Sequence, residues 1–427
     1  MVGKKILFIE TANDQFSTKF VLNLSESCSK KGVLFELLVP SKKQALHWNS
    51  MGLKAFSLPQ EGFEAEDSFF TYQMQRVLGV KSNKFLQKLP NKDQINSFLL
   101  KNNFDVALTY VGPEPFKFKI KNICTMIGLK YRVIDRPPIS GRLALVDTCF
   151  SVLDLSNTFN QLDRPSRESI DLFNSISKCE KITPKLNIHN KIIHTNKDIS
   201  SKTLIKFSQL KSMLGESRYR VLILIKRFFT KKLAKIIIFF RKRRSSTEGG
   251  DGYFFATQSS TETAFLYGTR LIDYPDSLML KVAEFVKQFS PIIFRLHPAT
   301  ANRLSIYALT RLVVNRLEIS YKEESPLKAI LASKAVIVWN SNFGFEAIIH
   351  GKPVITLADS FYGSVGLTHE IKSNNDLGKI FKYVENYEFN KEKVCLLIDS
   401  ILINSFPEGD GYDSIIDNAL NINRASE

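Results

Sequence analysis

The stretch from Ala335 to Gly366 constrains the fold most, because strand, polar turn, helix and strand signals follow one another within it. Ala335 to Trp339 is almost entirely apolar and predicts a buried strand, and Pro353 to Leu357 predicts a second one. Between them, the residues Asn340, Ser341 and Asn342 stand where a helix begins. The free backbone N–H groups of such a turn, with the positive end of the helix dipole, favour a phosphate or a carboxylate. An ordinary N-cap in an α/β protein is the alternative interpretation.

The short helix after this turn adds two candidate binding residues. Gly344 has no side chain, which lets a ligand approach the backbone closely, and Glu346 lies further along the same helix. We therefore predict a ligand-binding turn that consists of Asn340, Ser341, Asn342, Gly344 and Glu346.

Length and composition indicate a globular protein of more than one domain. The chain has 427 residues, of which 44% are hydrophobic and 24% charged. No signal peptide is visible, because the strand from Ile6 to Ile9 is short and is ended by Glu10, which predicts a cytoplasmic protein. The five cysteines have no CxxC spacing, so we expect buried apolar thiols rather than a zinc site or disulfides.

The N-terminal half opens with a strand, a helix and a strand. Lys5 to Ile9 and Leu34 to Val39 read as the strands, and Phe16 to Lys31 has the apolar spacing of a helix. The turn after the first strand lacks a GxGxxG pattern, which argues against a dinucleotide site there. Two further strands, Asp105 to Tyr110 and Lys130 to Ile134, predict a doubly wound sheet with its functional loops at the carboxyl ends of the strands.

Asp135 is the candidate catalytic residue of this half. It directly follows a buried strand and precedes Arg136 and two prolines that stiffen the loop. A preorganised carboxylate is expected at such a place. A capping or salt-bridged Asp is the alternative.

Residues 219–244 form a segment of different character. They include ten basic residues and no acidic one, in a chain with a formal net charge of +17. Their apolar runs are shorter than the ~20 residues of a spanning helix, which favours an interfacial helix on anionic lipid. Nucleic acid is a rival partner, but the apolar residues come in blocks rather than as aromatics spaced for base stacking. A buried helix with a solvated basic face is the third interpretation.

Three predicted strands of the C-terminal half end in polar residues, namely Gln258, His297 and Asn340. The carboxyl ends of parallel strands share one edge of a sheet, so we expect these three side chains to lie together. His297 is preceded by Arg295 and fixed by Pro298, which suits it to hold a phosphate or a leaving group.

These motifs resemble those of the bacterial capsule polysaccharide biosynthesis family. The resemblance rests on Gln258 with Glu262 four positions later, RLHP from Arg295 to Pro298, WNSNFGFEAIIHGKPV from Trp339 to Val354, and Tyr362 with Gly363. In the first half, IDRPPISGRLALVD from Ile134 to Asp147 is similar to a family segment with an acidic residue, Arg and Gly after a strand and a later Asp. The His-Pro pair is also shared with bacterial sialyltransferases, which use CMP-sialic acid.

The resemblance implies a GT-B fold and a CMP-activated 3-deoxy-ulosonic acid as donor, because the family contains retaining β-Kdo transferases. The family has Glu where this chain has Asp135, and Asp where it has Glu262. Retention requires either a nucleophilic carboxylate with an acid/base group or a front-face mechanism. We predict Glu262 as the nucleophile and Asp135 as the acid/base group. The alternative role for Glu262 is to cap the helix that follows it.

Neither a metal nor a cofactor is expected. No DxD-type cluster stands at a strand end, and the helix dipole together with His297 can stabilise a departing CMP. We therefore predict that Gln258, Arg295, His297, Pro298 and the turn at Asn340 bind the nucleotide sugar as a substrate.

The predicted fold is α/β, with two Rossmann-like domains facing one another across a cleft. Residues 1–200 form the acceptor domain, 201–250 a linker with the basic segment, and 251–405 the nucleotide-sugar domain, while 406–427 can return to the first domain. We predict a glycosyltransferase that moves Kdo from CMP-Kdo, with retention, onto a capsule or lipopolysaccharide acceptor at the inner face of the cytoplasmic membrane. A sialyltransferase, a sugar-nucleotide epimerase of the same fold and a basic lipid- or nucleic-acid-binding protein without chemistry are the alternatives.

Overall fold

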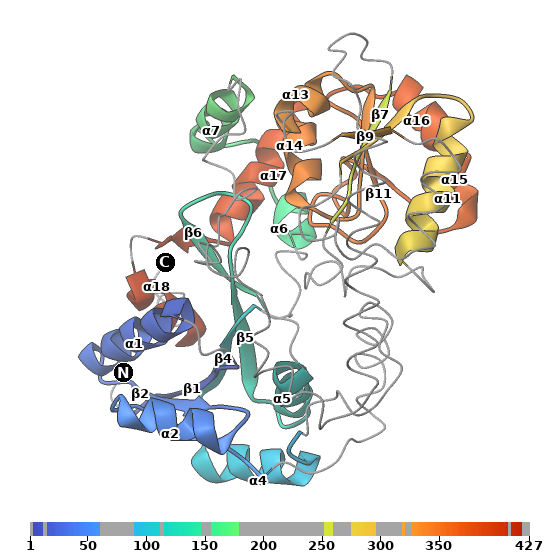
Figure 1. The fold of residues 1–427 in the computed structure, drawn as a ribbon. Helices are drawn as coiled ribbons and strands as arrows, with labels where there is room; N and C mark the ends of the chain where they lie inside the picture. The colour runs from blue at the N-terminus through green and yellow to red at the C-terminus, as the bar shows by residue number, and fades with distance from the viewer. Residues whose placement is uncertain are drawn as a thin grey trace, which may run out of the picture. The chain divides into compact units, whose positions relative to one another are not determined.

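The computed structural model describes residues 3–11, 15–59, 89–111, 115–146, 155–178, 252–258, 275–295, 318–320, 326–408 and 411–420. They form two compact α/β units. The described residues up to Ile170 and those from Cys395 onward make up the first unit, and those from Asp171 to Val394 make up the second. Each unit is built around its own sheet with helices packed against it (Figure 1). The predicted α/β fold with two Rossmann-like domains is thereby confirmed.

The two unit boundaries lie inside helices. The chain leaves the first unit within α7 (Arg167–Ser177) and returns to it within α17 (Lys391–Ile403). The sequence predicts instead a first domain that ends at residue 200, a linker over 201–250, and a second domain that ends at residue 405. A helix that continues from one unit into the next has no Gly- or Pro-rich composition at the boundary, so composition does not reveal it.

The first sheet is mainly parallel. Its described strands are arranged in the order β13-β6-β5-β4-β1-β2-β3, with β6 and β13 antiparallel at one end. The bounds of this unit's elements are β1 Lys5–Ile9, α1 Gln15–Lys30, β2 Leu34–Leu38, α2 Lys42–Ser50, β3 Lys54–Phe56, α4 Lys92–Asn102, β4 Val106–Tyr110, α5 Pro115–Met126, β5 Lys130–Asp135, β6 Arg142–Val146, α6 Ser156–Asn160, β13 Phe406–Pro407 and α18 Gly411–Leu420.

Both faces of this sheet are buried, which explains its nearly continuous apolar strands. In β1, Ile6 and Phe8 face a core shared with α1, α2 and α18, whereas Leu7 and Ile9 face a core shared with α4 and α5. The thiols of Cys28, Cys124 and Cys395 are buried and unbridged, as the sequence predicted.

The C-terminal segment completes the first unit. β13 pairs with β6, and α18 packs on α1, with a 2.6 Å ion pair between Asp417 of α18 and Lys31, which directly follows α1. Ile415, Ile416 and Ala419 of α18 belong to the same core as Phe8. The last described helix is therefore part of the first unit's interior.

The second sheet is wholly parallel among the described strands. Its order is β12-β11-β10-β7-β8-β9. The element bounds are β7 Tyr253–Ala256, α11 Pro275–Lys287, β8 Ile292–Arg295, β9 Glu318–Ser320, α13 Pro326–Leu331, β10 Ala335–Val338, α14 Asn342–Ile349, β11 Val354–Thr356, β12 His369–Glu370, α15 Asn374–Leu377 and α16 Ile380–Glu385.

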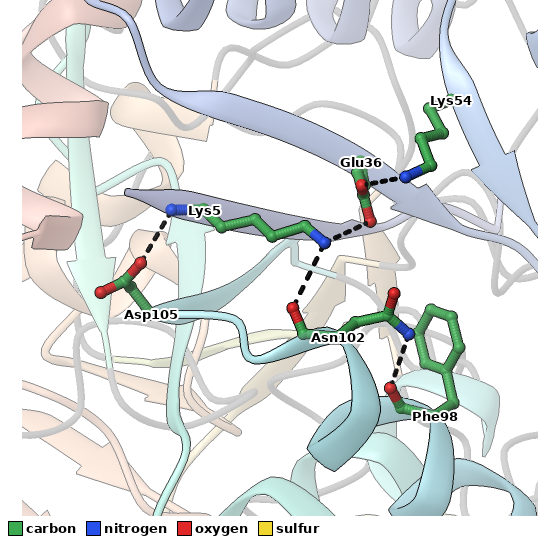
Figure 2. A network of polar contacts seen from close by, with 6 residues as sticks. All are labelled: Lys5, Glu36, Lys54, Phe98, Asn102 and Asp105. Carbon is green, nitrogen blue, oxygen red and sulfur yellow. Dashed lines mark hydrogen bonds and ion pairs between the residues drawn. The ribbon is translucent and has the colours of Figure 1, made fainter. Parts of the chain in front are cut away.

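A buried carboxylate joins three strands of the first sheet (Figure 2). Glu36 of β2, whose side chain is 7% exposed, forms an ion pair with Lys5 of β1 at 3.1 Å and accepts a hydrogen bond from Lys54 of β3 at 2.7 Å. The Lys5 ammonium also donates to the Asn102 carbonyl, at 3.2 Å, and lies 4.6 Å from the centre of the Phe104 ring. The two lysines differ in environment, because Lys5 is 15% exposed and Lys54 is 62% exposed.

We expect the two lysines to contribute very differently to stability. Lys5→Met leaves Glu36 with only a solvated partner and should lower the free energy of unfolding by about 3 kcal/mol. Lys54→Met removes an exposed partner and should cost less than about 1 kcal/mol. Urea unfolding in a Trp339→Phe background isolates the fluorescence of Trp48, which is buried in the first unit. Equal costs for the two variants would contradict the burial argument.

Candidate functional site

The carboxyl ends of β8, β7 and β10 lie side by side in the second sheet. In the register, Ala256 is opposite both Arg295 and Val338. Gln258 comes two residues after Ala256, and Asn340 comes two residues after Val338. The structure therefore places Gln258, Arg295 and Asn340 along one sheet edge, where ligands of open α/β sheets bind.

Asn340 links two neighbouring segments at this edge. Its backbone N–H donates to Gln258 Oε1 at 3.4 Å, and its side-chain Nδ2 donates to the Asp359 carbonyl at 3.0 Å. Gln258 and Asn340 are both 6% exposed. Thr257 fixes the next strand end, because its hydroxyl donates to the Arg295 carbonyl at 3.1 Å. The polar strand ends thus form a connected, largely buried edge.

Ser341 is the N-cap of α14. Its backbone is extended, with φ −75° and ψ 158°, and its carbonyl accepts the Gly344 N–H at 2.9 Å. Among the described residues, the Ser341 hydroxyl makes no capping bond and has no hydrogen-bond partner. This hydroxyl is itself buried, so an anion that it binds at the helix N-terminus must first displace the atoms that cover it.

Tyr362 explains the glycine at position 344. A Cβ atom on Gly344 would lie 2.7 Å from Tyr362 Cζ, and the Tyr362 hydroxyl donates to the Ser341 carbonyl at 2.8 Å. The space beside Gly344 is therefore filled by a buried ring of the same unit. This packing accounts for a glycine at position 344. Its predicted contact with a ligand stays a prediction.

Glu346 lies beneath this turn rather than on its surface. It is 0% exposed, and neither of its carboxylate oxygens has a hydrogen-bond partner in the described structure. Burial raises the pKa of Glu346 to about 7 and lowers the pKa of His350, whose Nε2 is 4.0 Å from Glu346 Oε1. A ligand that uses Glu346 must displace the atoms that cover it.

Asp135 is the last residue of β5, in the first unit. It is 6% exposed, and its Oδ1 accepts the backbone N–H of Arg136 at 2.8 Å. Within the described ranges its Oδ2 has no hydrogen-bond partner. Burial raises the pKa of Asp135 to about 7, against weaker opposite effects of the Arg136 N–H and guanidinium. Such a carboxyl group can accept or donate a proton at neutral pH.

The partners of Arg136, the residue that follows Asp135, were not predicted from the sequence. The Arg136 guanidinium pairs with Glu408 at 3.0 Å and hydrogen-bonds to the Tyr110 hydroxyl. Burial, opposed by Arg136, raises the pKa of Tyr110 to about 12, so its hydroxyl remains protonated. The position of Tyr110 at the end of a predicted strand could have identified it as a site residue. Glu408 is separated from Arg136 by 272 positions, and nothing in the sequence indicates that the two residues meet.

Several predicted residues lie outside the described ranges. These are Glu262, His297, Pro298 and the basic segment 219–244. Within the described ranges, no group of three or more His, Cys, Asp or Glu side chains is arranged to hold a metal ion. None of the described helices combines the length and apolar character needed to span a lipid bilayer.

Solved structures with an overall likeness to this chain come from several enzymes. KpsC of Thermosulfurimonas dismutans, a β-Kdo 2,7 transferase, is 11% identical over 99% of this chain and 100% of that chain, with a TM-score of 0.41. The UDP-GlcNAc 2-epimerase of Methanocaldococcus jannaschii is 14% identical over 97% and 99%, with a TM-score of 0.29. MurG of Acinetobacter baumannii is 10% identical over 98% and 99%, with a TM-score of 0.33.

A family match covers the region that contains the predicted donor site. Curated proteins gave no match to the sequence. Residues 250–380, however, match the family described as capsule polysaccharide biosynthesis protein. The matched segment includes Gln258, Arg295, the turn at Asn340 and Tyr362. The resemblance predicted from the sequence is thereby confirmed for residues 250–380, which carry the features of the capsule polysaccharide biosynthesis family.

Proposed function

We propose that this protein is a glycosyltransferase of bacterial surface-glycan synthesis that moves Kdo from CMP-Kdo, with retention, onto a glycan acceptor. The observation that carries the proposal is the family match over residues 250–380, which contain the polar strand ends of the second sheet. The alternatives of CMP-sialic acid as donor and of epimerisation remain as outcomes of the experiments below.

The donor nucleotide is proposed to bind at the carboxyl edge of the second sheet. The uncommitted Ser341 hydroxyl and the N-terminus of α14 suit the phosphate of CMP. Arg295, half-buried at the end of β8, supplies a guanidinium for a carboxylate or phosphate. His297 and Pro298 follow Arg295 in the sequence and are proposed to contact the same donor.

The chemistry is proposed to use two carboxyl groups. Glu262 attacks the anomeric carbon and CMP departs, with His297 and the α14 dipole stabilising its phosphate. Asp135 then removes the proton of the acceptor hydroxyl, whose oxygen displaces Glu262 and restores the original anomeric configuration. The near-neutral pKa of Asp135 supports its part in this sequence.

Nucleotide selectivity tests the proposal most directly. We expect CMP to raise the melting temperature of the full chain more than UDP, GDP or dTDP at equal concentration, because only a bound ligand stabilises the folded state. Hydrolysis of CMP-Kdo in preference to CMP-sialic acid then supports Kdo as the sugar. Stabilisation by UDP alone would instead favour an epimerase, and the reverse donor preference would favour a sialyltransferase.

Ser341→Ala is expected to weaken CMP binding about tenfold, which corresponds to about 1.4 kcal/mol for one lost hydrogen bond to a charged group. The fluorescence of Trp339, which directly precedes the turn, reports binding in a Trp48→Phe background. Ser373→Ala is the matched control, since Ser373 caps α15 in the same unit and outside the proposed site. Wild-type CMP affinity in Ser341→Ala would refute this placement of the phosphate.

The basic segment 219–244 is proposed to hold the enzyme on the anionic inner face of the cytoplasmic membrane, where a lipid-linked acceptor would be found. Its ten basic residues are the support for this proposal. Deleting it should release the protein from anionic liposomes in a sedimentation assay and spare reaction with a short soluble acceptor. Unchanged sedimentation after the deletion would contradict a role in membrane binding.

A further inference from the structure

The guanidinium of Arg136 bonds to groups other than the buried carboxylate beside it. Its Nη2 lies 3.0 Å from Glu408 Oε1, and its guanidinium also bonds to the Tyr110 hydroxyl. Only the backbone N–H of Arg136 reaches Asp135, at Oδ1. The other carboxylate oxygen, Oδ2, is buried and has no hydrogen-bond partner among the described residues.

Within the described ranges, this arrangement leaves the more buried of two carboxylates with no hydrogen bond from a cationic side chain. Asp135 is 6% exposed, whereas the Glu408 side chain is 45% exposed and solvent already stabilises its charge. A guanidinium bonded to Asp135 would satisfy its lone pairs and favour its ionised form. Because Glu408 holds the Nη2 end of this guanidinium, it competes with Asp135 for the same cation.

The position of Glu408 is fixed by the backbone. Its N–H donates to the Gly141 carbonyl at 2.7 Å, directly after β13 has paired with β6. The returning C-terminal segment thus carries a carboxylate to the turn that joins β5 and β6. The charge placed there is part of the fold rather than a freely moving surface group.

Two neighbouring titratable groups of the described structure bond to atoms other than those of Asp135. Lys117 of α5 donates to the backbone carbonyl of Tyr110 at 3.0 Å, not to Asp135. Tyr110 of β4 meets the guanidinium through its hydroxyl. Arg136 is accordingly the one cation that acts on Asp135 within the described structure.

We propose that Glu408 is a positioning residue that holds the Arg136 guanidinium away from Asp135 and leaves Asp135 Oδ2 for a hydroxyl group of a ligand. The use of Oδ2 in turnover rests on the proposed function, whereas the placement of Arg136 does not.

The test is a pH titration of the Asp135 side-chain carboxyl carbon by NMR in the full chain labelled with ¹³C-aspartate. The Asp135 signal is assigned by its loss in Asp135→Asn. Glu408→Gln should release Arg136 to Asp135 and lower the titration midpoint by at least one pH unit, a tenfold change in the protonation equilibrium. Glu408→Gln combined with Arg136→Gln should return the midpoint to the wild-type value or above.

Glu26→Gln is the matched control, because it removes an exposed ion pair with Lys30 elsewhere in the first unit and should leave the midpoint unchanged. If Glu408→Gln does not fold, Glu408→Asp shortens the reach by one methylene and should shift the midpoint in the same direction. An unchanged midpoint, or a wild-type midpoint near 4, would overturn the proposal. A shifted midpoint in a protein that does not cleave CMP-Kdo would overturn the proposed function and leave the placement of Arg136 standing.

Discussion

Replacing Asp135 by Asn is expected to reduce sugar transfer by two to four orders of magnitude, as befits the loss of a positioned acid/base group. CMP binding should be unaffected, since the proposed nucleotide residues are in the second unit. Transfer from CMP-Kdo and CMP-dependent thermal stabilisation, measured on the same preparation, separate the two effects. An active Asp135→Asn enzyme would remove Asp135 from the mechanism.

The same substitution should stabilise the first unit as the pH rises. Burial raises the pKa of Asp135 from 3.8 to about 7, so its folded state disfavours the charged form. Wild type therefore loses stability between pH 4 and about pH 7, by on the order of 4 kcal/mol, and Asn avoids that loss. Urea unfolding followed by Trp48 fluorescence should show the gain of Asp135→Asn growing over this range and then levelling off.

Asp105→Asn is a control for which we expect the opposite effect on folding stability. Desolvation raises the pKa of Asp105, but hydrogen bonds from the Lys4 ammonium and the Lys5 N–H outweigh it and hold the pKa below its usual value. Asp105 thus stabilises the fold above its unfolded pKa, and that contribution is lost as the pH falls. The Asp105→Asn protein should be less stable than wild type at pH 7. A gain in stability like that expected for Asp135→Asn would show that the Lys4 and Lys5 hydrogen bonds do not lower the pKa of Asp105.

Gly344→Ala is expected to destabilise the second unit by about 2–3 kcal/mol through overpacking. The added methyl group would overlap the buried Tyr362 ring, which cannot move without losing its bond to the Ser341 carbonyl. Urea unfolding in a Trp48→Phe background, followed by Trp339, isolates the second unit. CMP binding should weaken in parallel, because displacement of the ring disturbs the N-cap of α14.

Gly378→Ala controls for this substitution. Gly378 has a helical backbone, with φ −62° and ψ −17°, and the nearest atom to an added Cβ is 3.9 Å away. Its replacement should be neutral or slightly stabilising. Tyr362→Ala in the Gly344→Ala background should cost less than the sum of the two changes, because both act on the same contact. Equal stabilities of Gly344→Ala and Gly378→Ala would refute the steric explanation.

Local sequence signals predicted the parts of the fold in which burial dominates. β1 and β10 are short apolar runs because both faces of their sheets are covered, and polar residues mark where they end. This pattern was sufficient to place Asp135, Gln258 and Asn340 at strand ends.

Contacts between distant residues were not predictable in this way. The sequence predicts that residues 406–427 can return to the first domain, but it does not predict that β13 pairs with β6 or that α18 packs on α1. Glu408 meets Arg136 only because β13 returns to β6, and the reason for Gly344 is a ring 18 positions later. These features depend on the tertiary structure, which single-sequence periodicity does not encode.

The position of α18 has a consequence for how the protein is made. Ribosomes add about 5–20 residues per second, and domains generally fold in the order of their synthesis. α1 emerges early, but the core that it shares with Ile415 and Ile416 is completed more than 200 residues after the chain leaves the first unit. The first unit therefore remains incomplete for on the order of ten seconds or more after its early strands and helices have been synthesised. During this time Phe20, Val21 and Leu24 are not covered by α18. Nascent chains stalled before Gly411 should be more sensitive to proteases and bind chaperones more strongly than completed ones.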